Sequence, residues 1–325
     1  MQTPATDMFE LTIEAGFPLR VSPAQPGVGL AEAQPQLQAL VDQRLLEAGG
    51  ILFSGFDVGG AEAFRAFAAS FGHPLLNYEF GSTPRSKVHG GVYTSTEYPA
   101  HQHIPLHNEQ AYTREWPMKI WFYCDLAAQE GGQTPIADSR AIYRAMDSGI
   151  RRRFAEKGLM YVRNYGNGLD MPWQRVFNTD SRAEVQAYCT RQGIAFEWSD
   201  EGELRTRQHC QGVARHPVTG DGVWFNQAHL FHISALEPDT RDVLMDSVGE
   251  HMLPRNVYYG DGSPIADQEL DQVRAVLEQH KVVFPWQQGD VLMLDNMLAA
   301  HGRAPFQGPR KVLVAMAEGH GQPSA

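Results

Sequence analysis

Short apolar runs typical of buried strands lie near both ends of the chain, with helical patterns between them. The runs cover residues 51–53, 119–123, 282–285, 291–294 and 311–317. Apolar residues at helical spacing predict helices over about 36–47, 61–71, 140–158, 182–192, 237–252 and 266–280. Since no clear linker divides the sequence, we predict a mainly β core with helical additions. It forms a single domain over residues 1–325, with a helical insertion or lid at about 140–280.

The charge balance excludes whole classes of partner. The 325 residues include 27 Lys plus Arg and 38 Asp plus Glu, which gives a formal net charge of −11. A chain this acidic is poorly suited to broad electrostatic contact with nucleic acid or an anionic membrane. No apolar run approaches the ~18 residues that a membrane-spanning helix needs. We therefore expect neither nucleic acid nor a membrane as a partner.

Cysteine usage indicates a reducing compartment. The three cysteines, Cys124, Cys189 and Cys210, are odd in number and form no C-x-x-C pair. This argues against a disulfide scaffold and against a structural zinc site built from cysteines. Residues 1–21 lack the basic-then-apolar order of a secretory signal. We expect a cytoplasmic protein.

The first chemically informative stretch is His107-Asn108-Glu109. In an extended strand, positions i and i+2 face the same side, so His107 and Glu109 can present a nitrogen and an oxygen to one point. With a second, distant imidazole they would form the two-histidine, one-carboxylate triad that holds Fe(II) and leaves other positions open. Among 13 histidines, such a triplet also arises by chance, and it fits a structural histidine equally well.

The segment 294–303 can supply the missing imidazole, because His301 follows an expected strand and turn. Arg310 comes shortly afterwards and leads into an apolar strand. An arginine at the start of a buried strand needs an anion, since an unpaired buried guanidinium is costly. The alternatives for Arg310 are a surface position or a structural ion pair.

A third stretch, Gly131-Gly132-Gln133-Thr134-Pro135, reads as a turn that leads into a strand. In a functional reading, the Thr134 hydroxyl donates to the carboxylate of a ligand. One turn alone does not decide between the two.

Taken together, these stretches resemble the TauD/TfdA group of Fe(II)/2-oxoglutarate-dependent dioxygenases, and most closely its SyrP-like and clavaminate synthase-like branch. The resemblance covers most of the chain and is carried by residues 49–56, 92–99, 104–109, 131–140, 224–227 and 301–306. It implies a double-stranded β-helix (jelly roll) core flanked by helices. It also implies an enzyme with Fe(II) as cofactor and with 2-oxoglutarate and O2 as co-substrates.

The resemblance further assigns site residues. It implies that His107, Glu109 and His301 ligate the metal, and that Arg310 and Thr134 bind the far carboxylate of 2-oxoglutarate. Many members carry Asp where this chain has Glu109, whereas this branch uses Glu. The step from His301 to Arg310 is shorter than in several relatives, which leaves Arg303 as the alternative cation.

The resemblance implies hydroxylation of an unactivated carbon in an amino-acid-like substrate, as part of specialised metabolite biosynthesis. The substrate would be a free amino acid or one presented on a carrier protein. Related halogenases lack the carboxylate ligand, so Glu109 argues for hydroxylation over chlorination. Other outcomes of the same chemistry, desaturation or cyclisation, stay open. So do a non-catalytic protein on the same barrel and a zinc hydrolase with a similar three-ligand site.

Candidate substrate contacts come from two regions, one upstream of the first ligands and one in the helical middle, together with the arginine after His301. They are Tyr93, Thr94, Ser95, Asn226, Phe231 and Arg303. For Asn226 and Arg303, structural hydrogen bonding is the competing explanation.

Four further histidines could suggest a rival metal site. His101 and His103 are spaced for one face of a strand, but no carboxylate follows at matching spacing, so a loop is the better prediction. His229 and His232 could share a helix face, and we expect them to be core or lid residues.

Overall fold

Two β-sheets packed face to face form the centre of the protein. The computed structural model describes residues 10–77, 86–95, 98–166 and 168–321. The larger sheet has eight strands in the order β1-β2-β3-β16-β7-β19-β5-β4, and the smaller has the order β6-β17-β9. The strands of the larger sheet are β1 (Leu11–Glu14), β2 (Leu19–Pro23), β3 (Gly50–Phe53), β4 (Lys87–His89), β5 (Val92–Thr94), β7 (Glu115–Leu126), β16 (Val291–Asp295) and β19 (Lys311–Gly321). Those of the smaller are β6 (Ile104–His107), β9 (Ile136–Asp138) and β17 (Ala299–Arg303). This arrangement confirms the predicted jelly-roll core.

The central strands of the larger sheet carry long apolar runs because both of their faces are buried there. Along β7, Ile120 and Phe122 point into the layer between the sheets, while Trp121 and Tyr123 point to the outer face. The strand pairings continue this alternation, since Leu292 of β16 lies opposite Phe122. Period-2 alternation between two apolar layers therefore explains why these runs show no polar face.

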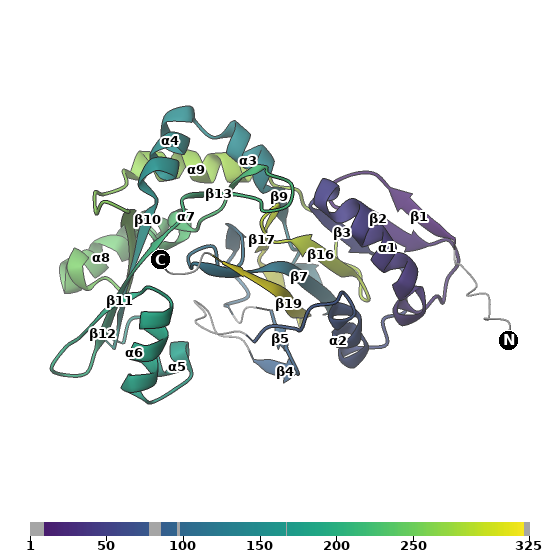
Figure 1. Cartoon of the computed structure of the whole chain (residues 1–325), viewed down its shortest axis with the longest axis horizontal. Coiled ribbons are helices and arrows are strands. Elements are labelled where there is room, and N and C mark those ends of the chain that lie inside the picture. Colours follow the sequence, from purple (N-terminus) through teal and green to yellow (C-terminus); the bar gives the residue numbers. More distant parts are fainter. Residues whose placement is uncertain (1–9, 78–85, 96–97, 167, 322–325) are drawn as a thin grey trace.

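Two N-terminal helices cover the outer face of the larger sheet (Figure 1). They are α1 (Leu30–Ala48) and α2 (Ala61–Ala69). The first begins earlier than the predicted residue 36 because Leu30 and Ala33 are also buried. It ends at Gly49, whose φ of 74° is a left-handed conformation that glycine adopts without strain.

The middle of the chain is not purely helical, which corrects the predicted helical insertion at about 140–280. It contains the four-stranded antiparallel sheet β11-β12-β10-β15, with α6 and α8 beside it at the opposite end of the molecule from α1 (Figure 1). The strands are β10 (Leu159–Tyr165), β11 (Ala195–Trp198), β12 (Leu204–Cys210) and β15 (Arg255–Tyr259). The helices are α3 (Ser139–Ala145), α4 (Ser148–Lys157), α5 (Trp173–Phe177), α6 (Arg182–Arg191), α7 (Ala228–Phe231), α8 (Pro238–Val248) and α9 (Asp267–Gln279). Short pairs complete the structure: β8 (Glu130–Gly131) with β18 (Phe306–Gln307), and β13 (Val213–Arg215) with β14 (Gly222–Trp224).

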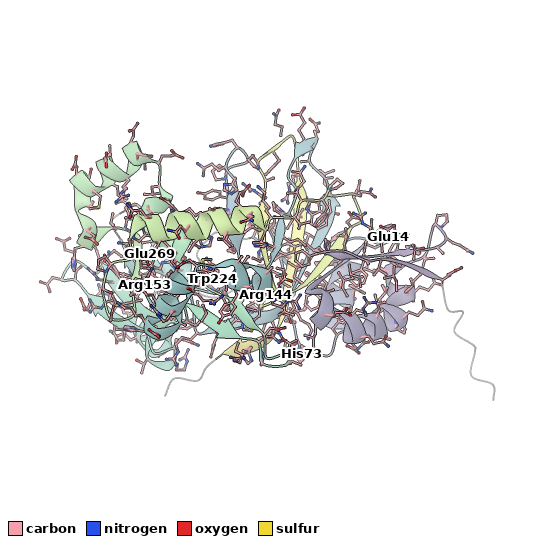
Figure 2. All side chains as sticks on the ribbon, turned by 90° about the horizontal axis from the view of Figure 1, so that it is seen from above. Glu14, His73, Arg144, Arg153, Trp224 and Glu269 are labelled. Atoms are coloured by element: carbon pink, nitrogen blue, oxygen red, sulfur yellow. The ribbon has the colours of Figure 1, made fainter. Side chains whose placement is uncertain are left out.

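The middle segment has its own apolar core. Trp224 packs against Phe154 of α4 with their ring centroids 4.8 Å apart, and Arg153 of the same helix pairs with Glu269 of α9 (Figure 2). The predicted helix at 140–158 is divided into α3 and α4 at Met146 and Asp147, because Asp147 caps the second helix with bonds to Gly149 N and Ile150 N.

Residues 282–285, predicted as a strand, form only an isolated bridge between Val282 and Ile136. All three cysteines are free and buried. None of the described helices combines the length and apolarity needed to cross a bilayer. Residues 1–9, which are part of the segment tested for a secretory signal, and residues 96–97 of the segment 92–99 lie outside the described part of the chain.

Candidate functional site

Three side chains from two elements of the smaller sheet and the turn beyond it converge on one point. The ligand atoms of His107, Glu109 and His301 all lie within 4.8 Å of one another. His107 ends β6, and His301 lies directly opposite it on β17, with their ring centroids 4.5 Å apart. Two imidazoles and one carboxylate are a donor set that suits a divalent first-row metal.

Hydrogen bonding and burial prepare the imidazoles for a metal. His107 Nδ1 lies 2.8 Å from the carbonyl oxygen of Pro105, which places the proton on Nδ1 and leaves the lone pair on Nε2 for a ligand. His301 and Glu109 are each only 4% exposed. Their Nε2 and Oε2 atoms are 3.8 Å apart, which is too long for a direct hydrogen bond and short enough for both to ligate one ion.

The main chain between His107 and Glu109 differs from the expected strand. β6 ends at His107, and Gln110 has a φ of 55°, so the chain turns sharply after the carboxylate. The i, i+2 spacing alone therefore does not hold Glu109. Its backbone is bonded instead by the side chain of Asn296, which comes from the turn between β16 and β17.

Beside this cluster lies a small cavity between the two sheets. It is lined by the two histidines and by four further polar residues that the sequence had singled out: Ser95, Thr134, Arg303 and Arg310. Phe122, Val312 and Val314 supply its apolar wall. The cavity thus combines an apolar wall, two of the metal-ligand residues and two cations.

Arg310 is placed at this cavity by hydrogen bonds from its guanidinium. Its Nε donates to the Gly132 carbonyl at 2.9 Å, and its Nη1 lies 3.4 Å from Ser95 Oγ. Burial and the neighbouring Arg303 lower the pKa of Arg310 to about 10, so it remains a cation at neutral pH. Among the ion pairs of the described residues, neither Arg310 nor Arg303 has a carboxylate partner. A cation that is buried without a carboxylate favours an anionic ligand.

Arg303 is held differently. Its guanidinium donates to three backbone carbonyls, those of Tyr98, Pro99 and Gln102, at 2.7–2.9 Å. It therefore organises the chain before β6 and its Nη groups are already engaged, whereas Arg310 keeps N–H groups for a ligand. This favours Arg310 over the alternative cation that the short His301–Arg310 step suggested.

The remaining candidates divide by location. Ser95 lies at the Arg310 end of the cavity, whereas Tyr93 is 7% exposed with its hydroxyl 3.4 Å from Asn77 Oδ1. Thr94 Oγ1 accepts from Ser86 N at 2.9 Å. Phe231 of α7 packs on the ring of Tyr112 with centroids 5.0 Å apart.

Asn226, predicted as a substrate contact, makes the structural hydrogen bonds that were its competing explanation. Its amide nitrogen donates to the Gly212 carbonyl at 2.6 Å, and its amide oxygen accepts from Ala228 N at 3.0 Å. It is 1% exposed and does not line the cavity described above. A short polar side chain just before a helix readily bonds the helix's free N–H groups, and that contact accounts for its burial.

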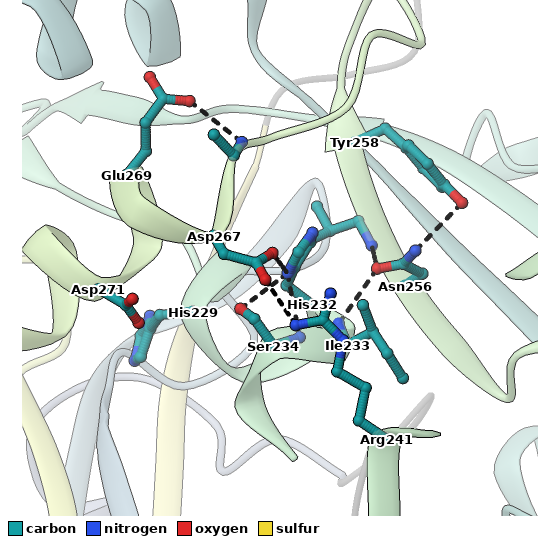
Figure 3. A network of polar contacts seen from close by, with 12 residues as sticks. His229, His232, Ile233, Ser234, Arg241, Asn256, Tyr258, Asp267, Glu269 and Asp271 are labelled. Carbon is teal, nitrogen blue, oxygen red and sulfur yellow. Dashed lines mark hydrogen bonds and ion pairs between the residues drawn. The ribbon is translucent and has the colours of Figure 1, made fainter. Parts of the chain in front are cut away.

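The four histidines considered for a rival metal site, His101, His103, His229 and His232, do not form one with one another. His101 and His103 are exposed and precede β6 in a turn, as expected. His229 lies 2.9 Å from the Leu106 carbonyl through Nε2, and burial lowers its pKa to about 3. His232 faces Ser234 and Asp267 instead, in a network that also includes Arg241 (Figure 3). Within the described residues, the one group of three or more such side chains that could hold a metal is His107, Glu109 and His301.

Two residues of the site gave no signal in the sequence analysis. Asn296 bonds the backbone at Glu109, and Trp286 donates from Nε1 to Thr134 Oγ1 at 2.8 Å. Asn296 stands within the segment 294–303 that was singled out for His301, so its position next to a ligand strand was the available clue. Nothing in the sequence pattern linked Trp286 to Thr134.

Comparisons with known proteins agree with this geometry. Residues 16–316 match the family model described as taurine catabolism dioxygenase TauD, TfdA family. The dapdiamide synthesis protein DdaC of Enterobacter agglomerans is 44% identical over 276 residues, which are 85% of this chain and 84% of that protein. A clavaminate synthase-like protein of Arabidopsis thaliana is 33% identical over 287 residues, 85% of this chain and 83% of that protein.

A solved structure shows the same fold. The crystal structure of PvcB from Pseudomonas aeruginosa superposes with a TM-score of 0.55 at 17% identity, covering 98% of this chain and 93% of that one. At this identity the likeness supports the fold, while the family match supports the chemistry. The chain belongs to the TauD, TfdA family, and it is an Fe(II)- and 2-oxoglutarate-dependent dioxygenase.

Proposed function

We propose that His107, Glu109 and His301 hold Fe(II), and that the enzyme hydroxylates an unactivated carbon of an amino-acid-like substrate. The observation that carries the assignment is the convergence of the three ligand atoms within 4.8 Å, beside a cavity with a cation at its far side. The donor set fits the metal, since three ligands on one side of an ion leave room for both co-substrates.

We further propose that Arg310 and Thr134 bind the far carboxylate of 2-oxoglutarate. A planar guanidinium can meet a carboxylate with two parallel hydrogen bonds, and the Thr134 hydroxyl adds a third donor. Arg310 is kept in place by the Gly132 carbonyl and by Ser95, so little side-chain freedom is lost when the ligand binds. Once bound, the iron supplies oxygen activation coupled to decarboxylation of 2-oxoglutarate.

The middle segment, about 140–280, is proposed to cover the site. Two of its side chains contact the backbone around the first ligand: Gln227 donates to the Asn108 carbonyl at 2.8 Å, and His229 lies against Leu106. A cover over an oxidising centre excludes water and holds the substrate near the metal. Phe231 lies on the same short helix as His229, and we place its ring along the path of the substrate.

Similarity to a dapdiamide synthesis protein supports a role in specialised metabolism with an amino-acid-like substrate. The proposed substrate is either a free amino acid or one attached to a carrier protein. Assays with both forms of the same amino acid distinguish the two. Glu109 occupies a ligand position, which supports hydroxylation over chlorination.

Desaturation is the second candidate outcome, because a tyrosine isonitrile desaturase of Pseudomonas aeruginosa is 22% identical over 294 residues of this chain. A product analysis separates it from hydroxylation, since desaturation adds no oxygen to the product.

The test has two stages. Anaerobic addition of Fe(II) and 2-oxoglutarate is expected to produce a weak visible charge-transfer band that zinc does not give. Oxygen uptake and succinate release are then measured across a panel of free and carrier-attached amino acids. Absence of the band with correctly folded protein would refute the metal and co-substrate assignment, and a chlorinated product would refute the hydroxylation assignment.

A further inference from the structure

We infer that Trp286 is a positioning residue that fixes the Thr134 hydroxyl as a hydrogen-bond donor into the cavity, and so helps the site select a 2-oxo acid that carries a second carboxylate. The inference rests on the proposed function, because it assumes that the cavity receives 2-oxoglutarate. It adds a residue outside the cavity lining and a reason for the choice of co-substrate.

The hydrogen bond between Trp286 and Thr134 has a fixed direction. Trp286 Nε1 and Thr134 Oγ1 are 2.8 Å apart. An indole nitrogen is only a donor, whereas a hydroxyl has one proton and two lone pairs. The Thr134 oxygen must therefore accept from Trp286, and its own proton must point elsewhere.

The surroundings of Thr134 limit where its hydroxyl proton can point. Thr134 is 2% exposed and lines the cavity. In the hydrogen bonds of the described residues, no group accepts from its hydroxyl. A buried donor without an acceptor is costly, so a ligand atom that accepts is favoured at this point.

The side chains around Thr134 also favour a carboxylate at this end of the cavity. Arg310 lines the same cavity, and its guanidinium has further N–H groups besides the Nε that bonds the Gly132 carbonyl. Arg303 also lines it and contributes positive charge, but its Nη groups already donate to three backbone carbonyls. A carboxylate accepts at both of its oxygens, from Thr134 and from Arg310, whereas an amide would place its own N–H groups against these donors. A methyl end would leave the Thr134 hydroxyl proton without an acceptor.

Backbone hydrogen bonds and aromatic packing keep Trp286 in place. The segment between α9 and β16 is tied to β9 at Val282, which exchanges backbone hydrogen bonds of 2.8 and 2.9 Å with Ile136. Phe284 packs edge-on against the Trp286 ring, with centroids 5.7 Å apart. The bridge that replaces the predicted strand at 282–285 thus brings the indole next to Thr134.

The experiment compares two 2-oxo acids of the same chain length, 2-oxoglutarate and 2-oxopentanoate, which lacks the second carboxylate. Their dissociation constants are measured on the Fe(II)-loaded protein without oxygen, from the charge-transfer band. Trp286→Phe is expected to weaken 2-oxoglutarate about 2- to 10-fold, as for loss of one neutral hydrogen bond. It is expected to leave 2-oxopentanoate unchanged.

A double-mutant cycle with Thr134→Val tests whether the effect passes through the hydroxyl. Thr134→Val is expected to weaken 2-oxoglutarate about 10- to 100-fold, and adding Trp286→Phe to it should cost nothing more. Trp198→Phe is the matched control, because Trp198 is another partly exposed indole but lies on β11, in the four-stranded sheet of the middle segment. Trp286→His keeps a ring N–H and tests the same bond if the phenylalanine variant does not fold.

The outcomes separate this inference from the proposed function. If the wild-type protein gives no band with 2-oxoglutarate, the proposed function fails. If the wild type binds and Trp286→Phe weakens both acids equally, weakens neither, or adds fully to Thr134→Val, the role of Trp286 is refuted.

Discussion

The side-chain amide of Asn296 bonds both backbone polar groups of Glu109. Its oxygen accepts from the Glu109 N–H at 2.7 Å, and its nitrogen donates to the Glu109 carbonyl at 3.0 Å. The same nitrogen donates to the Pro117 carbonyl at 2.8 Å, and Asn296 is fully buried. One amide therefore fixes the main chain of the carboxylate ligand relative to β7.

Asn296→Asp should lower metal affinity about 10- to 100-fold, the usual effect of losing a residue that orients a ligand. The variant keeps the size and the acceptor, but it loses the N–H donors and places an oxygen against two carbonyls. We also expect a loss of about 3 kcal/mol in the free energy of unfolding. Iron titration and urea unfolding measure the two effects.

Asn164→Asp is the matched control for that prediction. Asn164 is buried and also donates to two carbonyls, those of His251 and Leu253, at 3.0 and 2.6 Å. It lies on β10, away from the ligands. Both variants should lose similar stability, and equal loss of metal affinity in the two would show that Asn296 acts only through folding.

Glu109→Ala should reduce iron affinity more than about 100-fold, since removing a ligand exceeds the cost of losing its supporting partner. Succinate formation from 2-oxoglutarate should fall with it. Glu130→Ala, a change at an exposed carboxylate on β8, serves as the control. Retention of stoichiometric iron by Glu109→Ala would contradict the proposed ligand set.

Arg310→Lys should weaken 2-oxoglutarate about 10- to 100-fold while changing the free energy of unfolding by less than about 1 kcal/mol. Lysine keeps the charge but cannot form two parallel hydrogen bonds with a carboxylate. The measurement is the same anaerobic titration.

Arg303→Lys should show the opposite balance. A single ammonium cannot reach the three carbonyls that the two Nη groups of Arg303 bond, so we expect about 2–4 kcal/mol of destabilisation and a smaller change in 2-oxoglutarate affinity. If Arg303→Lys weakened the ligand more than Arg310→Lys, the two assignments would have to be exchanged.

Gly132→Ala should weaken 2-oxoglutarate binding through Arg310. Gly132 has a φ of +71°, and an added Cβ would lie 3.0 Å from the Cδ and Nε atoms of Arg310. Gly220→Ala is matched for backbone strain, with a φ of +74° and no atom within 4 Å of the added Cβ. Both should lose about 1 kcal/mol of stability, and only the first should bind the co-substrate less tightly.

Stability should fall on acidification through His229. Burial lowers its folded-state pKa to about 3, and the unfolded value is about 6.5. Between these values the unfolded chain binds the proton and the folded chain does not, so folding weakens as the pH falls. This histidine should cost about 2 kcal/mol between pH 7 and pH 5.

His229→Gln removes the titrating group and keeps a donor for the Leu106 carbonyl. The difference in urea midpoints between pH 7 and pH 5 should therefore shrink in this variant. An unchanged pH dependence would show that other groups control acid stability.

The sequence was sufficient for the core strands and the three converging side chains. Both depend on local patterns: apolar runs buried on two faces, and a histidine and a carboxylate two positions apart next to a distant histidine. Thr134 came from the separate segment 131–135 and Arg310 from its place after His301, and both line one cavity with His107 and His301.

Other features required the folded chain. The sheet of β10, β11, β12 and β15 was missed because its strands lie between helices and carry mixed polar residues, such as Arg205 and Arg207 on β12. The two explanations for Asn226 could not be separated from the sequence, because a buried amide that bonds backbone has the same sequence signature as one that binds a ligand. The contacts of Trp286 and Asn296 join segments distant in sequence, which no local pattern reports.

The position of His301 on β17 also sets the order of assembly. This strand pairs with β6 on one side and β9 on the other, so the histidine reaches its partners only after the C-terminal part of the chain has been synthesised and has closed the barrel. A chain that stops before β17 holds His107 and Glu109 but lacks the third donor, His301. Fragments of this kind should therefore be recovered as metal-free apoprotein.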